Sequence, residues 1–311
     1  MAQVRSNVSW MRSRLLLAVL AGLAPLAANC QSINVLWYTY AHPDSRYRQS
    51  IQKLADVAHT LPQSSGLEWR LTFFGPDSPA PAFGRYNVLV IHSAEAGFTG
   101  RYSISPEGVA TQQPNVVPDY KGILRNKAAI EAARGERTFI TGSDADVHTI
   151  NGDTGNAPPA PTGAARPLIC HPIITSPTCW DGALGHLVNA VNWAASGRGL
   201  GIVSLVAAEY PGAMWWDHQD SFLRGELQGH VKVFGEKTRE NHPVIPVAAQ
   251  RYALNYGLTA TGLGNWKNSF HAGISRSIPG YVSVVDSTMH PNLAVAIATS
   301  KFASAGANGP P

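Results

Sequence analysis

The feature that most constrains the fold is a repeated alternation of short apolar runs with segments of helical pattern. Five runs rich in β-branched and aromatic residues predict buried strands: Asn34–Tyr40, Trp69–Gly75, Tyr86–His92, Arg137–Gly142 and Leu200–Ala207. Three segments predict helices: Arg46–Leu61, Ile123–Arg134 with Gly135 ending it, and Asp181–Ser196 with Asp181 as its cap. This alternation is typical of an α/β fold, a mostly parallel sheet with helices on both faces.

The rest of the chain is less regular. Tyr281–Asp286 and Ala294–Thr299 predict two closing strands, whereas Thr149–Thr178, rich in Gly, Pro, Ala and Thr, predicts a loop excursion. With 44% hydrophobic and 14% charged residues the chain should fold rather than remain disordered. We therefore expect a single α/β domain over residues 29–303, with a loop excursion at 149–178 and a disordered tail at 304–311.

The first 28 residues predict a secretory signal peptide. Three arginines and no acid precede the apolar run Leu15–Ala24, and Pro25 and small residues follow it. A membrane anchor is the alternative, but the run has only about half of the roughly 20 residues that span a bilayer, and no later segment is long enough. Lipidation at Cys30 is a further alternative that Asn29 disfavours. The protein should therefore be periplasmic or extracellular, with no membrane span in the mature chain.

The expected export and the net charge determine what we expect of the cysteines and of the binding partners. Cys170 and Cys179 lie nine positions apart in a Pro-rich loop, and we expect a local disulfide between them, two unpaired thiols being the alternative. Without the three arginines of the signal peptide the formal charge falls from +4 to about +1. No basic stripe is evident, so nucleic acid is not an expected partner.

Several of these segments together resemble a known group of proteins. They are the strand NVLWYTY before His42, the strand YNVLVIHSA, the helix–strand pair ILRNKAAIEAARGERTFITGSD, and the late segments RENHPVIP and YGLTATGLGNWKNSFHAGI. The chain resembles the class I glutamine-amidotransferase-like superfamily and, within it, the ThuA-like (trehalose-utilisation) proteins. Its late segment is similar to exported proteins of bacteria that use the PEP-CTERM sorting system. The resemblance covers about two thirds of the chain and implies a flavodoxin-like or amidotransferase-like sheet.

The chain departs from the pattern of these proteins at the residues that would carry out catalysis. A glutamine amidotransferase of this class needs a cysteine nucleophile on a tight strand-to-helix turn, and no cysteine here follows a predicted core strand. The nucleophile elbow G-x-S-x-G is also absent, as are G-x-G-x-x-G and Walker-type loops. Glutaminase chemistry, an ordinary α/β-hydrolase and a nucleotide cofactor are therefore not expected.

The first candidate site begins where the predicted strand Arg137–Gly142 ends. Ser143, Asp144, Asp146 and His148 follow at once, with Asn151, Asp153 and Asn156 beyond. Ligands bind outside the carboxyl ends of strands in open parallel sheets. The oxygens of Asp144, Asp146 and Asp153 suit Ca²⁺, whereas Asp144, Asp146 and His148 at alternate positions suit Zn²⁺ or Mn²⁺. Ser143 is a weaker candidate nucleophile. The alternative is that these acids cap turns and face solvent.

The second candidate site is Trp215-Trp216-Asp217-His218, with Asp220, Glu226 and His230 downstream. Acids beside aromatic rings can form a polar site with an apolar wall that suits a sugar face, and such a carboxyl group often has a raised pKa. Asp217 and His218 are the second catalytic candidates. In the alternative interpretation the tryptophans belong to the core and the charges are exposed.

Isolated histidines form the third group: His242, His271 two positions after Ser269, and His42 and His92 at predicted strand ends. Any of them can act as a general base, but a lone histidine is more often structural.

Together these features favour an exported hydrolase of a small ester, lactone or glycoside that activates water by acid–base chemistry or with a divalent metal. The alternative is a non-catalytic surface protein that binds carbohydrate through Trp215 and Trp216.

Overall fold

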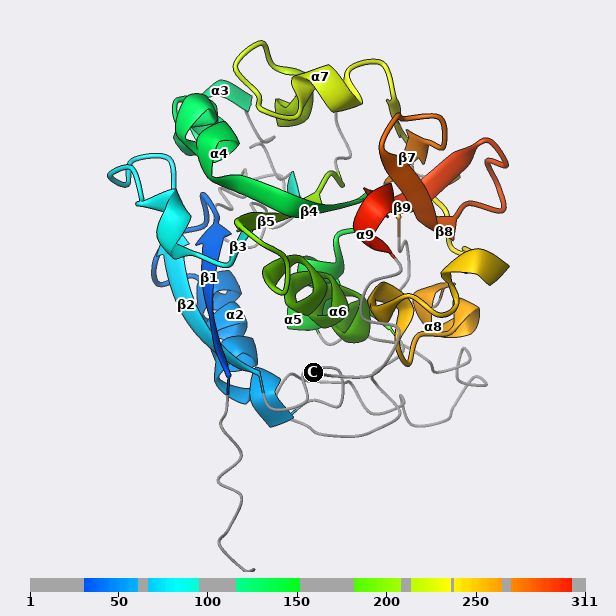
Figure 1. Cartoon of the computed structure of the whole chain (residues 1–311), viewed down its shortest axis with the longest axis horizontal. Helices are drawn as coiled ribbons and strands as arrows, with labels where there is room; N and C mark the ends of the chain where they lie inside the picture. The colour runs from blue at the N-terminus through cyan, green and yellow to red at the C-terminus, as the bar shows by residue number, and fades with distance from the viewer. Residues whose placement is uncertain are drawn as a thin grey trace, which may run out of the picture. The chain divides into compact units, whose positions relative to one another are not determined.

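The computed structural model describes residues 31–60, 67–94, 116–151, 182–207, 214–235, 238–264 and 270–303. These residues form an α/β fold around one mixed, mostly parallel sheet (Figure 1). The parallel part comprises β1 (Ser32–Tyr38), β2 (Glu68–Phe74), β3 (Val88–Ile91), β4 (Arg134–Thr141) and β5 (Leu200–Leu205). The later strands are β6 (Val231–Val233), β7 (Ala272–Ser275), β8 (Tyr281–Asp286) and β9 (Leu293–Thr299).

The strand order is β2-β1-β3-β5-β4-β9-β7-β6, with β8 paired to β9 outside this path. The direction changes at β9, which runs antiparallel to both β4 and β7. In register, β9 places Thr141 of β4 opposite Ala296 and Ile274 of β7 opposite Ala294. β7 therefore points the same way as β4 but lies further along, so that it begins near the place where β4 ends.

Two hydrophobic cores lie on opposite faces of the sheet, because alternate residues of each strand point to opposite sides. In β1, Val35 and Trp37 pack into one core, and Leu36 and Tyr38 pack into the other. The helices divide accordingly (Figure 1). One face is covered by α2 (Arg46–Val57), α5 (Ala145–Asn151), α6 (Ala183–Ala195) and α8 (Ala260–Gly264), and the other by α3 (Val116–Leu124), α4 (Lys127–Ala133) and α7 (Arg224–Leu227). A short α9 (Ser300–Ala303) follows β9.

The expected α/β class with helices on both faces is confirmed, and each expected strand is present with its ends shifted by a few residues. Two local expectations were wrong. The predicted helix Ile123–Arg134 is two helices that part near Asn126, whose side-chain amide turns back to donate to the Gly122 carbonyl at 2.7 Å. Gly135 does not end a helix but lies inside β4, where a Cβ would sit 1.9 Å from the Arg198 carbonyl oxygen.

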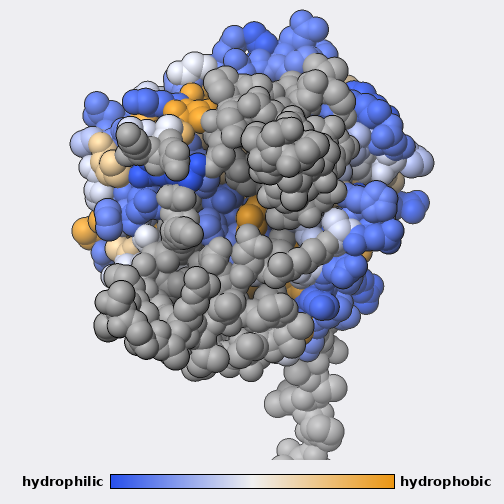
Figure 2. Space-filling model, turned by 180° about the vertical axis from the view of Figure 1, so that it is seen from behind, coloured by the Kyte–Doolittle hydropathy of each residue, from blue (hydrophilic) through white to orange (hydrophobic). Residues whose placement is uncertain are grey.

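The predicted loop excursion was also misplaced at its start, because residues 149–151 belong to α5. The remainder of that excursion, the signal peptide, the tail, and Cys30, Cys170 and Cys179 lie outside the described residues. Among the helices that the structure describes, none has both the length and the apolar character to cross a membrane. On the face shown in Figure 2 the described surface is predominantly hydrophilic, with scattered hydrophobic residues.

Candidate functional site

The end of β4 is joined closely to the start of β7. The carbonyl of Gly142 accepts the backbone N–H groups of His271 at 2.8 Å and Ala272 at 3.2 Å, and the Gly142 N–H donates to Val295 at 2.9 Å. This approach requires glycine, since a Cβ at position 142 would lie 1.8 Å from the Ala272 carbonyl oxygen. The sheet thereby places the backbone of His271 beside the residues that follow β4.

Helix α5 starts immediately after this junction. The backbone carbonyl of Asp144 accepts the N–H groups of Val147 at 2.9 Å and His148 at 3.1 Å, so Asp144 lies at the first turn of the helix. Residues four positions apart share one face of a helix. The helix therefore turns the side chains of Asp144 and His148 towards each other, on the side where His271 arrives from β7.

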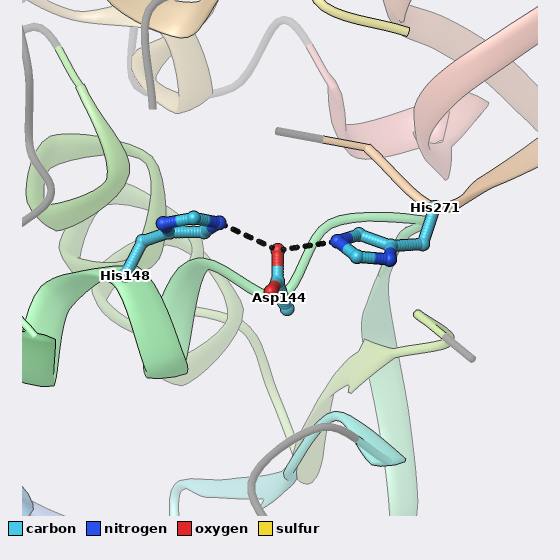
Figure 3. A group of neighbouring side chains, drawn as sticks. All are labelled: Asp144, His148 and His271. Carbon is cyan, nitrogen blue, oxygen red and sulfur yellow. Dashed lines mark ion pairs between the residues drawn. The ribbon is translucent and has the colours of Figure 1, made fainter. Parts of the chain in front are cut away.

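The result is a buried Asp–His–His group (Figure 3). Asp144 Oδ1 lies 3.2 Å from His148 Nε2 and 3.3 Å from His271 Nε2, with the two imidazoles on opposite sides of the carboxylate. The residue exposures are 4% for Asp144, 7% for His148 and 3% for His271. Burial by itself raises the pKa of Asp144, but attraction to the two imidazoles outweighs it and holds this pKa well below the ordinary value. Asp144 therefore stays a carboxylate at neutral pH.

These three residues can hold one metal ion, because one ligand atom from each lies within 4.8 Å of the others. Among the described residues no other set of His, Cys, Asp and Glu side chains meets this condition. The structure thus brings two of the predicted ligands, Asp144 and His148, close together. Of the acids of this segment, Asp144 and Asp146 do not face solvent, because both are buried.

Asp146, expected as a third ligand, points elsewhere. Its carboxylate accepts hydrogen bonds from the Tyr47 hydroxyl at 2.7 Å, the Ser93 hydroxyl at 2.7 Å and the Ser93 N–H at 3.1 Å. The physical reason is the helix: positions 144 and 148 face one way, and position 146 faces away from them. Burial raises the pKa of Asp146, and the nearby Asp144 adds to that rise. Asp146 fastens α5 to α2 and to the end of β3. Asp153, the other predicted ligand, lies outside the described residues.

Ser143 is fully buried and not arranged as a nucleophile. Its hydroxyl lies 3.1 Å from the Thr141 hydroxyl, which also contacts His186 Nε2 at 3.2 Å and donates to the Val295 carbonyl at 3.1 Å. These contacts join the end of β4 to α6 and β9 and indicate a structural role.

The second predicted site does not have the form that the sequence suggested. Trp215 and Trp216 are buried, with residue exposures of 0% and 1%, and so do not offer an exposed ring to a sugar. Glu226 is bound by Arg134 and Tyr281 rather than by a histidine. The structure places Asp217 and His218 in and after a short 3₁₀ turn, where His218 Nδ1 lies 3.7 Å from Asp220.

Of the isolated histidines, only His271 joins the group. His42 pairs loosely with the exposed Asp44 at 3.7 Å, and the His242 N–H donates to the buried Glu240 at 2.6 Å. Ser269 lies outside the described residues. Sequence reasoning treated His271 as one general-base candidate among several and did not connect it with Asp144. The only signal was a histidine directly before a short apolar run, which does not reveal where that run pairs.

Comparisons with known proteins add nothing to this assignment: no family model, no curated protein and no solved structure matches the chain.

Two other buried histidines make stability depend on pH. Burial lowers the pKa of His92 to about 3, with Arg48 adding to the effect, and burial lowers the pKa of His186 to about 3. An unfolded histidine takes up its proton near pH 6.5, and these folded ones only near pH 3. Their contribution to stability is therefore complete above about pH 6.5 and declines as the pH falls towards 3. Asp144, with its lowered pKa, adds a further loss only below about pH 4.

We expect the free energy of unfolding in urea to fall by about 3–4 kcal/mol between pH 7 and pH 5, at about 1.4 kcal/mol per pH unit for each histidine. His92→Phe and His186→Phe should each remove about half of that slope. A stability that stays level over this range would contradict the buried neutral state of both imidazoles.

Proposed function

We propose that Asp144, His148 and His271 bind one Zn²⁺ ion, and that the protein is an exported hydrolase that uses zinc-activated water on a small ester or lactone. The observation that carries this proposal is the convergence of one carboxylate oxygen and two imidazole nitrogens at the end of a central strand. Catalytic zinc sites commonly have three protein ligands, two histidines and a carboxylate among them, and leave the fourth position to water.

Two of the three ligand separations agree with such a centre. Ligand atoms about 2.0–2.1 Å from a tetrahedral zinc ion are about 3.3 Å apart. The two separations from Asp144 Oδ1 are 3.2 and 3.3 Å. The two imidazoles lie on opposite sides of the carboxylate, with ligand atoms within 4.8 Å of each other, so they would have to turn towards a common point to take up the ion.

The donor set favours zinc over calcium. Calcium prefers six to eight oxygen ligands, whereas this group supplies two imidazole nitrogens and a single carboxylate. Imidazole suits Zn²⁺, and Mn²⁺ is the weaker alternative because it prefers oxygen. Metal ligands must be deprotonated, so protons compete with the ion and metal affinity should fall in acid.

The chemistry follows from the charge of the ion. A zinc ion held by these residues would lower the pKa of a bound water to about 7, which would make hydroxide available at neutral pH, and it would polarise the substrate carbonyl, whose carbon is the atom that hydroxide attacks. An ester or lactone carbonyl is the group best suited to this attack. A glycosidic bond has no carbonyl and depends more on a carboxylic acid that protonates the leaving group.

A metal-free mechanism is the second candidate, because the same contacts are those of an aspartate that orients a histidine. Asp144 would then hold one imidazole in position to act as a general base towards water. The two mechanisms differ in their response to chelation, which makes them separable by experiment.

The test uses the purified protein and three substrates: an aryl acetate, a δ-lactone and an aryl glycoside. We expect turnover of the acetate or the lactone, its loss in EDTA, and its recovery with Zn²⁺ but not with Ca²⁺. Bound zinc measured by mass spectrometry should approach one ion per chain. Activity that persists in EDTA would favour the metal-free mechanism. An absence of turnover on all three substrates would contradict the hydrolase and favour a binding protein.

A further inference from the structure

His92 lies at the same edge of the sheet as the Asp–His–His group. It is the first residue after β3, and β5 pairs in parallel with both β3 and β4, so the ends of these strands are neighbours. The next residue, Ser93, donates both its N–H and its hydroxyl to Asp146. The segment that carries His92 is thus fastened to the segment that carries Asp144.

The imidazole of His92 is enclosed by aromatic rings. The ring of Tyr40 meets it edge-on at a centroid distance of 4.4 Å, and that of Tyr120 is inclined to it by 29° at 5.9 Å. Trp215 in turn stacks on Tyr120 at 5.6 Å. Because burial lowers the pKa of His92 to about 3, its ring is neutral and offers one N–H donor and one lone pair.

These two polar atoms have no evident structural use. Although His92 is fully buried, neither ring nitrogen has a hydrogen-bond partner among the described residues. Such groups are uncommon in folded proteins because an unsatisfied buried polar atom destabilises the fold. A phenylalanine would occupy an aromatic environment of this kind without that penalty. The presence of histidine therefore points to a hydrogen bond with a molecule outside the chain.

We propose that His92 is a substrate-contacting residue: its neutral imidazole hydrogen-bonds a carbonyl or hydroxyl oxygen of an uncharged molecule, a lactone or a pyranose. This proposal rests on the proposed function and narrows its substrate class. A neutral imidazole cannot balance a charge, and an unpaired charge is strongly disfavoured in so enclosed a place.

The experiment uses the full chain with two substitutions, His92→Phe and His92→Gln, and His186→Phe as the matched control. His186 is also a buried histidine among aromatic rings, but its Nε2 contacts the Thr141 hydroxyl at 3.2 Å. Thermal unfolding tests whether the unpartnered imidazole of His92 destabilises the fold. Binding of δ-valerolactone and of methyl β-glucopyranoside, measured by NMR titration without metal, tests ligand contact apart from turnover.

We expect His92→Phe to raise the melting temperature by roughly 2–4 °C, and His186→Phe to lower it. We also expect His92→Phe to weaken the binding of at least one probe about tenfold, and His92→Gln, which keeps a donor and an acceptor, to retain most of it. The probe that binds identifies the ring as a lactone or a pyranose.

Three results would overturn the proposal: a lower melting temperature for His92→Phe, unchanged probe binding in that variant, or no binding of either probe to the wild-type protein. If His92-dependent binding is seen but zinc-loaded protein does not turn over the lactone, the proposed hydrolysis fails while the binding role of His92 stands.

Discussion

Replacing His271 with alanine, or Asp144 with asparagine, should lower zinc affinity by more than 100-fold and abolish metal-dependent turnover. Loss of a residue that merely orients a ligand typically weakens metal affinity 10- to 100-fold, so loss of a ligand itself should exceed that range. Isothermal titration in competition with a chelator measures the affinity. Thermal unfolding gives a second readout, because zinc at 100 times its Kd should stabilise the wild-type protein by about 2.7 kcal/mol and neither variant by a comparable amount.

The matched control is the pair His42 and Asp44, which combines the same residue types at an exposed position. His42→Ala and Asp44→Asn should leave zinc affinity unchanged. If the variants at 144 and 271 retained stoichiometric zinc, the assigned ligands would be wrong. If turnover survived both of these substitutions, the site would lie elsewhere, with Asp217 and His218 the next residues to replace.

Gly142→Ala should strongly destabilise the protein, because among the described glycines an added Cβ at position 142 meets the closest atom. The added carbon would lie 1.8 Å from the Ala272 carbonyl oxygen, a backbone atom that cannot turn aside. The end of β4 and the start of β7 would have to separate, with loss of the hydrogen bonds from His271 and Ala272 to Gly142. We expect a loss of about 3 kcal/mol or more in the free energy of unfolding in urea. In the protein that still folds, zinc affinity should fall, because His271 moves with β7.

Gly225→Ala is the control for this prediction. Gly225 lies in α7 with no atom within 4 Å of the position of an added Cβ, so alanine there should be neutral or stabilise the helix by up to about 1 kcal/mol. Equal stability of Gly142→Ala and Gly225→Ala would show that the junction between β4 and β7 tolerates a wider spacing than the structure describes.

The sequence was informative about strands because buried parallel strands are nearly continuous apolar runs. Leu200–Leu205 and Val88–Ile91 are fully buried, and both had been predicted within two residues at each end. Helix α5 was not predicted, because its first turn carries Asp144 and Asp146, residue types that favour turns over helix interiors. That omission caused the error in the site. Without a helix, alternate positions were expected to share a face, which put Asp146 beside Asp144. In the helix the residue four positions on, His148, lies beside Asp144 and Asp146 faces away.

His271 could not have been assigned from the sequence by local rules. His271 reaches Asp144 because β4 and β7 both pair with β9, in a register that places the start of β7 near the end of β4. This register depends on pairings between segments that are distant in the sequence. Periodicity gives the face of an element, but not the partner beside it. Asp144 and His148 could be predicted as neighbours from their positions in the sequence. His271, the third member of the group, could be placed only from the pairing of the strands.

The offset between β4 and β7 also has a consequence for the order in which the protein assembles. Asp144 and His148 come from the parallel strands and helices of the first part of the chain, and His271 comes from the antiparallel strands of the last part. Contacts between segments so distant in sequence form late in folding, because the intervening chain must first be ordered. A folding intermediate that has built only β1 to β5 would bind metal weakly through two ligands. Tight binding would appear only when the last strands dock, so metal release should report the earliest detachment of the C-terminal strands, before the rest of the sheet unfolds.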